Sequence, residues 1–356
     1  MGKREMTFTF RQRIGALVFE LPLYLYYLVR KRANSAPSLL FIRNRNDKID
    51  VSTNPVGIKC KWQWTSDLYL PKVYPYIANM MFGRTLSTFH FELSTDQRIS
   101  ESRAEVSFII GHRGSSRLNL LLKTIESIAN QDCAIECIVV EQDEQPSLEH
   151  HLPSWVRYVF TPIDKPGTPY SRASAFNAGA KQAASECLIF HDNDLLIPSD
   201  YASHTLALFN RGFEFINLKR FIFYLSKSAS EEFIKKSNLH RKLEIESVMQ
   251  NAEGGGSIGA SKMAFFDIGG FDERFVGWGS EDNEFWERAL TRNTWEFGYL
   301  PLIHLWHASQ TEKLDIENSP TKRLYNELSK QSAVERIKAL NNRSNMNGNG
   351  VKDVRA

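Results

Sequence analysis

The chain has 356 residues, of which 42% are hydrophobic and 24% are charged. It is therefore long enough to bury a full core and to form about two domains. Its net charge of +3 is small for this length, and its basic residues form no long stripe interleaved with aromatic residues. Both observations argue against nucleic acid as a partner.

The four cysteines, Cys60, Cys133, Cys137 and Cys187, are sparse, and three of them lie in or beside apolar runs. This pattern predicts free thiols in a reducing compartment. Cys133 and Cys137 stand one residue further apart than a CxxC pair, and the chain has no second cysteine pair. No zinc site is therefore predicted from them.

Near the start of the chain, residues 14–29 form a strongly apolar run with basic residues on both sides. The run is shorter than the ~20 residues that a spanning helix needs, and Glu20 and Pro22 interrupt it. A basic triplet, residues 30–32, follows where a secretory signal would carry a cleavage site. The pattern favours a helix that lies in the membrane interface, with contact through residues 11–32. The alternative is a core helix of the N-terminal region.

Residues 35–104 hold short mixed segments separated by prolines, which predicts a small β-rich or irregular subdomain without assigned chemistry. From Glu105 onward the pattern changes to strand, helix and strand, at residues 106–112, 118–131 and 136–142. This alternation predicts an α/β fold with a mostly parallel sheet covered by helices. Ligands of such sheets bind at the carboxyl ends of the strands.

Two carboxylates follow a further apolar run, residues 187–190, at the end of a predicted strand. Asp192 and Asp194 flank Asn193, and in an extended segment both side chains would point to the same side. They could therefore face one divalent cation, with magnesium or manganese preferred by oxygen ligands. A polar turn with local hydrogen bonds is the alternative for this short pattern.

Residues 269–288 form the most informative block of the chain. Glycines and aromatic residues lead into an acidic cluster, residues 281–284, which opens a predicted helix with Phe285 and Trp286 on its buried side. Sugar rings stack on aromatic faces and carboxylates accept bonds from sugar hydroxyls, so this mixture suits a sugar site with Asp282 as the base. Helix capping and dipole compensation are a structural explanation that is compatible with that role.

Toward the C-terminus the composition of residues 320–342 favours a helix, and residues 343–356 look disordered.

Four blocks of the chain together resemble one family. They are IIGHRGSSR (109–117), YSRASAFNAG (170–179), HDNDLLIP (191–198) and the long glycine-rich block that ends in WGSEDNEFWER (254–288). In this order they resemble GT-A glycosyltransferases, specifically the β1,4-galactosyltransferase family and its bacterial glycosyltransferase family 2 relatives, over residues 106–310. The resemblance implies a GT-A nucleotide-sugar-binding fold, plus an N-terminal extension.

The resemblance implies roles for residues at the strand ends. His112 and Arg113 would hold the uridine end of a UDP-sugar donor, and Glu141 would contact the base or ribose. Arg172 would lie near the nucleotide, and Asp192 would face the ribose and phosphate.

A metal site is also implied by the resemblance. Asp194 would ligate Mn²⁺ or Mg²⁺ directly. The family completes this site with a Met and a His three residues apart, and the corresponding segment here is HLWH, with His304 in place of the Met and His307 in place of the His. Histidine is a good ligand for first-row metals, so the change is compatible with binding and could alter metal preference. A histidine satisfied within the core is the alternative for His304.

The last block implies which residues would contact the acceptor. Glu281 would bind acceptor hydroxyls, Asp282 would take the proton from the attacking hydroxyl, and Trp278 would line the interface between donor and acceptor. The family has another acidic residue where this chain has Asn283, which affects the expected acceptor specificity. Two glycines of the triplet that opens the block, Gly255 and Gly256, allow either close backbone approach to a ligand or a tight turn.

We therefore predict four parts: a membrane-associating segment (1–34), a small subdomain (35–104), a GT-A domain (105–312) and a C-terminal helix with a flexible tail (313–356). The GT-A domain would have a donor half at about 105–200 and an acceptor half at about 250–312. The predicted activity is inverting, metal-dependent transfer of a hexose, galactose first, from a UDP-sugar to a glycan or lipid-linked glycan, on the inner membrane face, for surface polysaccharide synthesis.

Two other functions stay open at this point. A sugar-nucleotide pyrophosphorylase would also use a nucleotide sheet with paired aspartates, but the expected glycine-rich phosphate loop is missing after the first strand. A non-catalytic carbohydrate-binding protein could keep the aromatic and acidic pocket, although it would not need Asp194 and His307 together.

Overall fold

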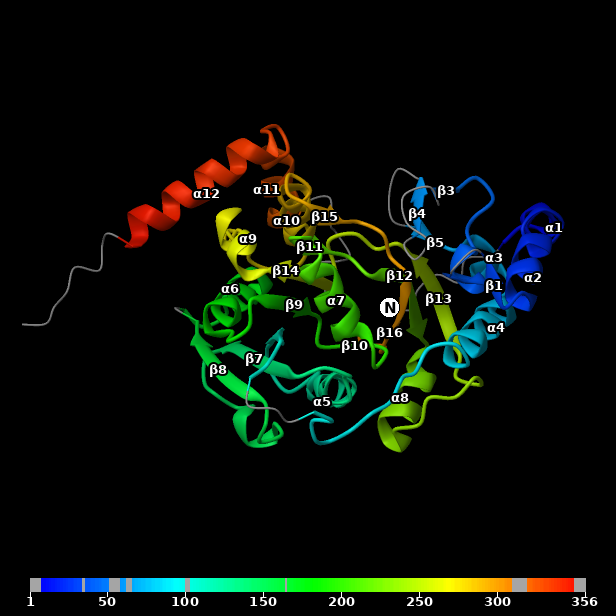
Figure 1. The fold of residues 1–356 in the computed structure, drawn as a ribbon, viewed down its shortest axis with the longest axis horizontal. Helices are drawn as coiled ribbons and strands as arrows, with labels where there is room; N and C mark the ends of the chain where they lie inside the picture. The colour runs from blue at the N-terminus through cyan, green and yellow to red at the C-terminus, as the bar shows by residue number, and fades with distance from the viewer. Residues whose placement is uncertain are drawn as a thin grey trace, which may run out of the picture.

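The computed structural model describes residues 8–33, 36–50, 58–61, 66–99, 103–163, 165–308 and 319–348. Among these residues the largest sheet has seven strands in the order β15-β11-β14-β9-β6-β7-β8 (Figure 1). The strands are β6 (Val106–His112), β7 (Ile135–Asp143), β8 (Arg157–Pro162), β9 (Cys187–His191), β11 (Phe215–Ile216), β14 (Ser257–Ser261) and β15 (Thr294–Trp295). The four strands from β6 to β9 run parallel, which confirms the predicted α/β fold and parallel sheet.

Helices cover both faces of this sheet. Successive residues of β6 point to opposite faces, so Phe108 belongs to one hydrophobic cluster and Ile109 to the other. On the Phe108 side the sheet packs against α5 (Leu118–Ala129) and α7 (Tyr201–Asn210). On the other side lie α6 (Arg172–Gln182), α9 (Lys262–Asp267) and α10 (Glu281–Ala289). Burial on both faces explains why the strands read as continuous apolar runs rather than alternating ones.

A second sheet has five strands, and the chain enters it directly after β9 of the first sheet. Its order is β10-β16-β12-β13-β5. The strands are β5 (Ser66–Asp67), β10 (Leu195–Leu196), β12 (Lys219–Leu225), β13 (Ile245–Gln250) and β16 (Leu300–His304). The chain leaves β9 and passes through a short turn into β10, which pairs antiparallel with β16 so that Leu195 lies opposite His304. This register brings the segment after β16 to the turn between β9 and β10.

The N-terminal apolar run forms two helices, α1 (Phe10–Phe19) and α2 (Leu21–Val29), instead of the one that we expected. The break falls at Glu20, and Pro22 stands in the first turn of α2, where its missing N–H has no cost. Within the described residues no helix combines the length and the apolar character that a membrane crossing requires.

The prediction of a β-rich or irregular subdomain at residues 35–104 is only partly right, because this region also contains α3 (Tyr69–Val73) and α4 (Pro75–Leu86). Pro75, which looked like a helix breaker, is the first residue of α4, a position that tolerates proline. Besides β5, the remaining elements of the region are β2 (Ala36–Pro37), η1 (Ser38–Phe41), β3 (Lys48–Asp50) and β4 (Lys59–Lys61), and β1 (Arg32–Ala33), which pairs with β2, lies just before it. All four cysteines are buried and free, as predicted.

Two further elements complete the described chain before the C-terminus: η2 (Glu149–His151) and α8 (Lys227–Lys236). The C-terminal region forms two helices, α11 (Pro320–Leu328) and α12 (Ala333–Gly348), and α12 extends away from the body of the molecule at the upper left of Figure 1. The prediction of disorder from residue 343 onward is wrong for residues 343–348, which continue α12. Residues 349–356, also predicted to be disordered, lie outside the described residues.

Candidate active site

The polar residues that follow the parallel strands lie at one edge of the large sheet. The register of β6 places His112 opposite Glu141 of β7 and Ile110 opposite His191 of β9. Asp192 and Asp194 follow His191 immediately. The expected grouping at the carboxyl ends of the strands is therefore present.

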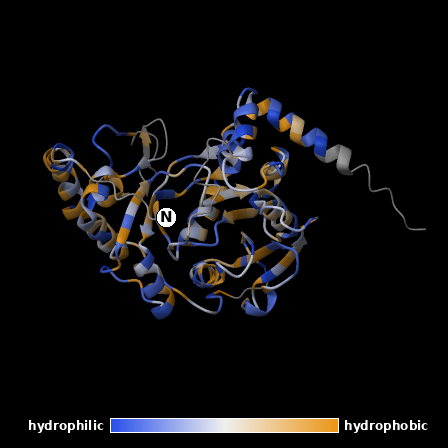
Figure 2. Cartoon of the chain, turned by 180° about the vertical axis from the view of Figure 1, so that it is seen from behind, coloured by the Kyte–Doolittle hydropathy of each residue, from blue (hydrophilic) through white to orange (hydrophobic). Residues whose placement is uncertain are grey.

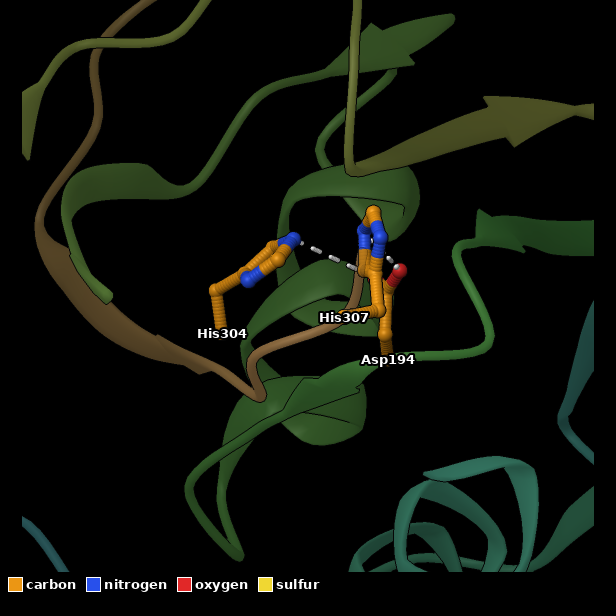
Figure 3. Close-up of side chains that lie close together, drawn as sticks. All are labelled: Asp194, His304 and His307. Carbon is orange, nitrogen blue, oxygen red and sulfur yellow. Dashed lines mark ion pairs between the residues drawn. The ribbon is translucent and has the colours of Figure 1, made fainter. Parts of the chain in front are cut away.

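Asp194, His304 and His307 come together at this edge (Figure 3). The Nε2 of His307 lies 3.2 Å from Oδ2 of Asp194, and the Nε2 of His304 lies 3.7 Å from Oδ1 of the same carboxylate. One ligand atom from each residue fits within 4.8 Å of the other two. Among the described residues this is the group with the spacing of a metal site, and Asp192 is not part of it.

The donor set fits a divalent cation of the first transition row. Burial alone would raise the pKa of Asp194, but His304, His307 and Arg117 outweigh it and hold that pKa well below its usual range. Burial lowers the pKa of His304 although Asp194 acts in the opposite direction, and a lowered pKa favours the neutral imidazole whose lone pair can bind a metal. The buried Nδ1 of His304 has no hydrogen-bond partner. A carboxylate with two imidazoles suits Mn²⁺ and related ions.

Arg117 also reaches this cluster, and our sequence reasoning assigned it no role. Its guanidinium donates to Oδ2 of Asp194 at 3.3 Å and lies 3.0 Å from Nδ1 of His307. The residue ends the IIGHRGSSR block, so the resemblance was the signal that could have identified it. Its positive charge stands next to the three candidate ligands, where an anionic group such as a diphosphate would also be attracted.

The other carboxylate of the pair, Asp192, points to a different partner. Arg172 binds its Oδ1 through Nε at 2.8 Å and through a terminal nitrogen at 2.6 Å. A further nitrogen of Arg172 lies 3.4 Å from Oε1 of Glu281 at the start of α10. We call this arrangement the Arg172 bridge, because it connects the turn after β9 to the acidic helix.

Asp282 is packed directly against the glycine triplet. A Cβ atom on Gly255 would stand 2.6 Å from Oδ2 of Asp282, and one on Gly254 would stand 2.7 Å from its carbonyl oxygen. Gly254 and Gly256 have φ values of 38° and 85°, in the region that favours glycine. The tight turn is therefore present, and the close backbone contact seen here is with the candidate base, while approach of the glycines to a ligand stays a prediction.

Glu281 is buried beside Asp282, and its Oε2 has no hydrogen-bond partner. Burial and the neighbouring charge of Asp282 raise the pKa of Glu281 to about 7, although Arg172 acts in the opposite direction. Phe285 and Trp286 are buried behind these residues, as predicted. Glu281 is therefore a carboxyl that can exist with or without its proton near neutral pH.

The three residues expected to hold the uridine end are bonded within the chain. The ring nitrogens of His112 contact the Gly114 carbonyl at 2.8 Å and the Asn193 amide at 2.8 Å. The Arg113 guanidinium donates to the Thr168 carbonyl at 2.6 Å. Contacts from these groups to a nucleotide stay predictions.

Glu141 is fully buried, and its carboxylate accepts from the backbone of Ser147 and Leu148, from the Ser147 hydroxyl at 2.6 Å and from the Tyr158 hydroxyl at 2.5 Å. Burial alone would raise the pKa of Glu141, but these bonds lower it overall. The carboxylate orders the loop after β7, and its contact to a base or ribose stays a prediction.

Lys219 is a second group that sequence reasoning missed. It is fully buried in β12, and its Nζ donates to the Ser257 carbonyl at 2.5 Å, next to the glycine triplet. Burial lowers the pKa of Lys219 to about 7, although Asp192 acts in the opposite direction. No local pattern in the KRFIFYL strand distinguishes this lysine from a surface one.

Trp278 is half-buried in the loop before α10.

Comparisons with known proteins find a matching family and several relatives. The family described as "Glycosyltransferase like family 2" matches residues 107–340. Beta-1,4-galactosyltransferase 5 of Mus musculus is 31% identical over 151 residues, which cover 40% of this chain and 33% of that protein. Beta-1,4-galactosyltransferase 6 of Rattus norvegicus is 30% identical over 170 residues, or 45% of this chain and 38% of that protein. The matched stretch therefore spans little more than a third of these relatives.

A first prediction concerns metal binding without turnover. Asp194→Asn, His304→Ala and His307→Ala should each weaken Mn²⁺ binding to the purified protein by at least about 10-fold, because each removes a donor from a three-donor set. Titration calorimetry measures the affinity. His204→Ala is the matched control, because His204 is partly exposed and outside the cluster. Unchanged affinity in the three variants would contradict the assignment.

A second prediction concerns pH. The raised pKa of Glu281, about 7 against an ordinary 4.5, means that the folded protein binds a proton that the unfolded chain has already released. The stabilisation is fully present below the unfolded pKa and is lost as pH rises through about 7. We expect Glu281→Gln to lose less unfolding free energy than the wild type between about pH 5 and pH 8.

Urea denaturation at several pH values measures this difference. Glu231→Gln serves as the control, because Glu231 is exposed on α8. Stability curves of wild type and Glu281→Gln that run parallel across the range would show that Glu281 keeps an ordinary pKa.

Proposed function

The chain belongs to glycosyltransferase-like family 2, and from this premise we propose that it is an inverting, metal-dependent hexosyltransferase. The donor would be a UDP-sugar, with galactose favoured by the similarity to beta-1,4-galactosyltransferases. The acceptor would be a hydroxyl of a glycan or lipid-linked glycan in surface polysaccharide synthesis. N-acetylgalactosamine, N-acetylglucosamine and glucose are the other donor sugars to test.

The observation that carries the proposal is the Arg172 bridge. It joins Asp192, two residues from the candidate metal ligand Asp194, to Glu281, the neighbour of the candidate base Asp282. The groups that would hold a nucleotide diphosphate and the groups that would activate an acceptor are thus parts of one polar network. A binding protein would have no need for this combination, because recognition of a sugar requires neither a metal ligand set nor a base.

The chain supplies side chains for each part of a single displacement. Asp282 would accept the proton of the acceptor hydroxyl as its oxygen attacks the anomeric carbon, and the bond from that carbon to the diphosphate oxygen would break. Glu281 would orient the acceptor, since its free Oε2 can bind a hydroxyl. A divalent cation held by Asp194 and the two histidines would neutralise the charge that develops on the departing UDP. One displacement converts an α-linked donor into a β-linked product.

Charged groups of the chain would support the same step. Arg117 and Arg172 place two guanidinium groups near the carboxylates of the turn after β9, where they can bind phosphate oxygens. The glycine triplet and the loop from Gly277 to Ser280 would close over the donor and exclude water. Limited proteolysis that is unchanged by donor and metal would count against this closure.

We also propose that the N-terminal helices bind a membrane surface. Large apolar side chains are exposed on α1 and α2, with exposed fractions between 39% at Leu17 and 81% at Val29. The set comprises Phe10, Ile14, Leu17, Val18, Phe19, Leu25, Tyr26 and Val29. Figure 2 shows apolar and polar residues alternating along this pair of helices, at the left of the view. Exposure of this much apolar side chain in one place is typical of an interaction surface.

The charges around this apolar surface favour anionic lipid as the partner. Arg11, Arg13 and the triplet at residues 30–32 are all exposed beside it. Basic residues next to an apolar helical face are attracted to the negative inner leaflet, each by about 1 kcal/mol near the surface. The proposed location is therefore the cytoplasmic side, peripheral on the inner membrane face, where a lipid-linked acceptor would be within reach.

A third prediction tests the activity. With Mn²⁺ and a panel of UDP-sugars, release of UDP should occur with one donor, galactose first, and stop with EDTA. Asp282→Asn should lower turnover by at least about 100-fold, because a general base contributes about that much. Asp267→Asn is the matched control, since that carboxylate is partly exposed on α9. The product should be β-linked by NMR. If the wild type released no UDP with any donor and acceptor mixture, the proposal would be contradicted.

A fourth prediction tests the membrane surface. The wild type should co-sediment with vesicles that contain phosphatidylglycerol and bind phosphatidylcholine vesicles less well. The double variant Val18→Asp, Val29→Asp should lose most of this binding, because each change places a charge in the apolar face. Met263→Asp is the control, since Met263 is an exposed apolar residue elsewhere. Equal binding by the double variant, or concentration-dependent dimers instead of vesicle binding, would contradict a lipid partner.

A further inference from the structure

The acidic helix α10 is held from behind by the C-terminal helices. Glu281 and Asp282 belong to its first turn and lie toward Arg172 and the glycine triplet. Glu284 and Arg288 follow on the buried side of the helix and are almost completely inaccessible. Arg288 binds both carboxylate oxygens of Glu284, at 2.7 Å for the closest pair, and donates to the Ile268 carbonyl at 2.6 Å.

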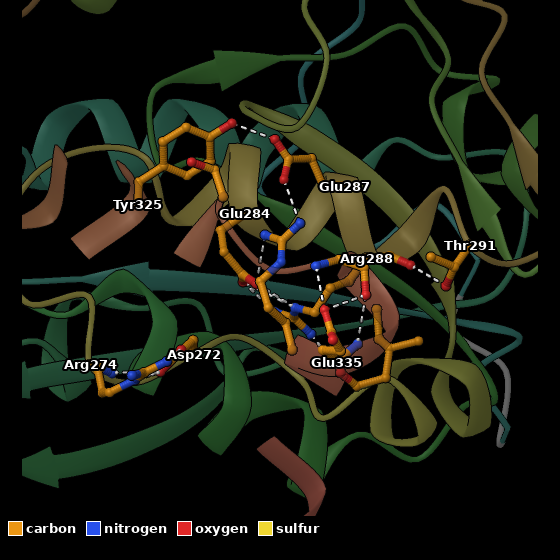
Figure 4. Close-up of polar contacts among 12 residues, drawn as sticks. Asp272, Arg274, Glu284, Glu287, Arg288, Thr291, Tyr325 and Glu335 are labelled. Atoms are coloured by element: carbon orange, nitrogen blue, oxygen red, sulfur yellow. Dashed lines mark hydrogen bonds and ion pairs between the residues drawn. The ribbon is translucent and has the colours of Figure 1, made fainter. Parts of the chain in front are cut away.

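Arg336 of α12 completes this arrangement. Its guanidinium lies 3.3 Å from Oε1 of Glu284 and 2.6 Å from Oε2 of Glu287, and the residue is itself buried. The Tyr325 hydroxyl of α11 donates to the other oxygen of Glu287. Figure 4 shows Tyr325, Glu287, Glu284 and Arg288 linked in one set of polar contacts. Two carboxylates of α10 are thus bound by side chains from both C-terminal helices.

A separate contact reaches the loop before α10. The Thr321 hydroxyl of α11 donates to the Trp278 carbonyl at 2.7 Å, and Thr321 is buried. This loop bends sharply, with positive φ at Gly277, Gly279 and Ser280. Ser280 has φ of 71° and makes no side-chain cap for α10. The helix therefore begins without a capping side chain, and an external hydrogen bond holds the backbone three residues before its first turn.

We propose that α11 and α12 form a brace that sets the position of the acidic helix, with Thr321 and Arg336 as positioning residues for Glu281 and Asp282. This inference rests on the proposed function of those two carboxylates. A buried charge network has a defined geometry, because each carboxylate must keep its partners. A helix held at Glu284 and Glu287 and at the preceding loop cannot tilt without breaking these bonds. The brace acts through α10 and touches no reacting atom.

The test uses the full-length protein and a matched pair of substitutions. Thr321→Val keeps the shape of the side chain and removes the hydroxyl, whereas Thr321→Ser keeps the hydroxyl. Arg336→Met removes the charge and keeps much of the length. Lys330→Ala is the control, because Lys330 pairs with Glu327 on the exposed side of the same region.

Two readouts separate the brace from the proposed activity. Hydrogen–deuterium exchange in peptides covering residues 278–290 should be faster in Thr321→Val and Arg336→Met, and unchanged in Thr321→Ser and Lys330→Ala. This measurement needs no turnover, so it tests the brace even if the donor panel gives no product. Unchanged exchange in both variants would overturn the brace itself.

The second readout compares the effect of each substitution on kcat with its effect on the Kd for UDP. In Thr321→Val we expect kcat to fall by about 10-fold or more, since small displacements of catalytic groups have effects of this order. Thr321→Ser should restore it, and the Kd for UDP with Mn²⁺ should stay within about 2-fold of the wild type. Faster exchange with an unchanged kcat would show a structural contact only and would overturn the positioning role. Parallel loss of kcat and UDP affinity would do the same, because it indicates general disruption.

Discussion

The pairing of the half-buried Arg172 guanidinium with two carboxylates is the interaction on which the site depends. The guanidinium lies between Asp192 and Glu281, which come from parts of the chain 89 residues apart. Removing charges from water costs several kcal/mol per ion unless each is paired. The planar, permanently charged group of arginine can serve two carboxylates at once, which a lysine ammonium does less well. Because these charges must stay paired, the turn after β9 and the start of α10 are fixed relative to each other.

The positions of the two histidines are set by a different constraint, which is the connection between the two sheets. The chain passes from β9 through the turn with Asp194 into β10, and β10 pairs with β16 in the second sheet. A shift of this register by one residue would turn His304 to the other face. His304 also stacks on Tyr224 of β12, with 4.4 Å between the ring centroids. His304 is thus held by sheet hydrogen bonds and packing, whereas Asp194 lies in the turn before β10 and His307 lies beyond the end of β16.

The sequence was sufficient for the features that depend on local pattern. Apolar runs predicted β6, β7 and β9, and the acidic block predicted α10 with Phe285 buried. The sequence was insufficient for features that depend on tertiary contacts, such as which residues from distant segments lie in the site. Lys219 reaches the site only through folding, and nothing in its neighbouring residues indicates it, whereas Arg117 could have been identified from its place in the IIGHRGSSR block. The helix α4 was not predicted, because a proline can mark either the end of one element or the first turn of the next, and Pro75 is the first residue of this helix.

Two of the buried polar atoms without hydrogen-bond partners belong to the candidate site. Oε2 of Glu281 and Nδ1 of His304 are both inaccessible and unbonded, whereas most buried polar atoms are paired. One belongs to the acidic helix and the other to the histidine cluster. An unpaired buried acceptor costs about 1–3 kcal/mol, which the fold must offset elsewhere. Such a cost is expected at a site whose remaining partners are brought by ligands, since the groups must be free to receive them.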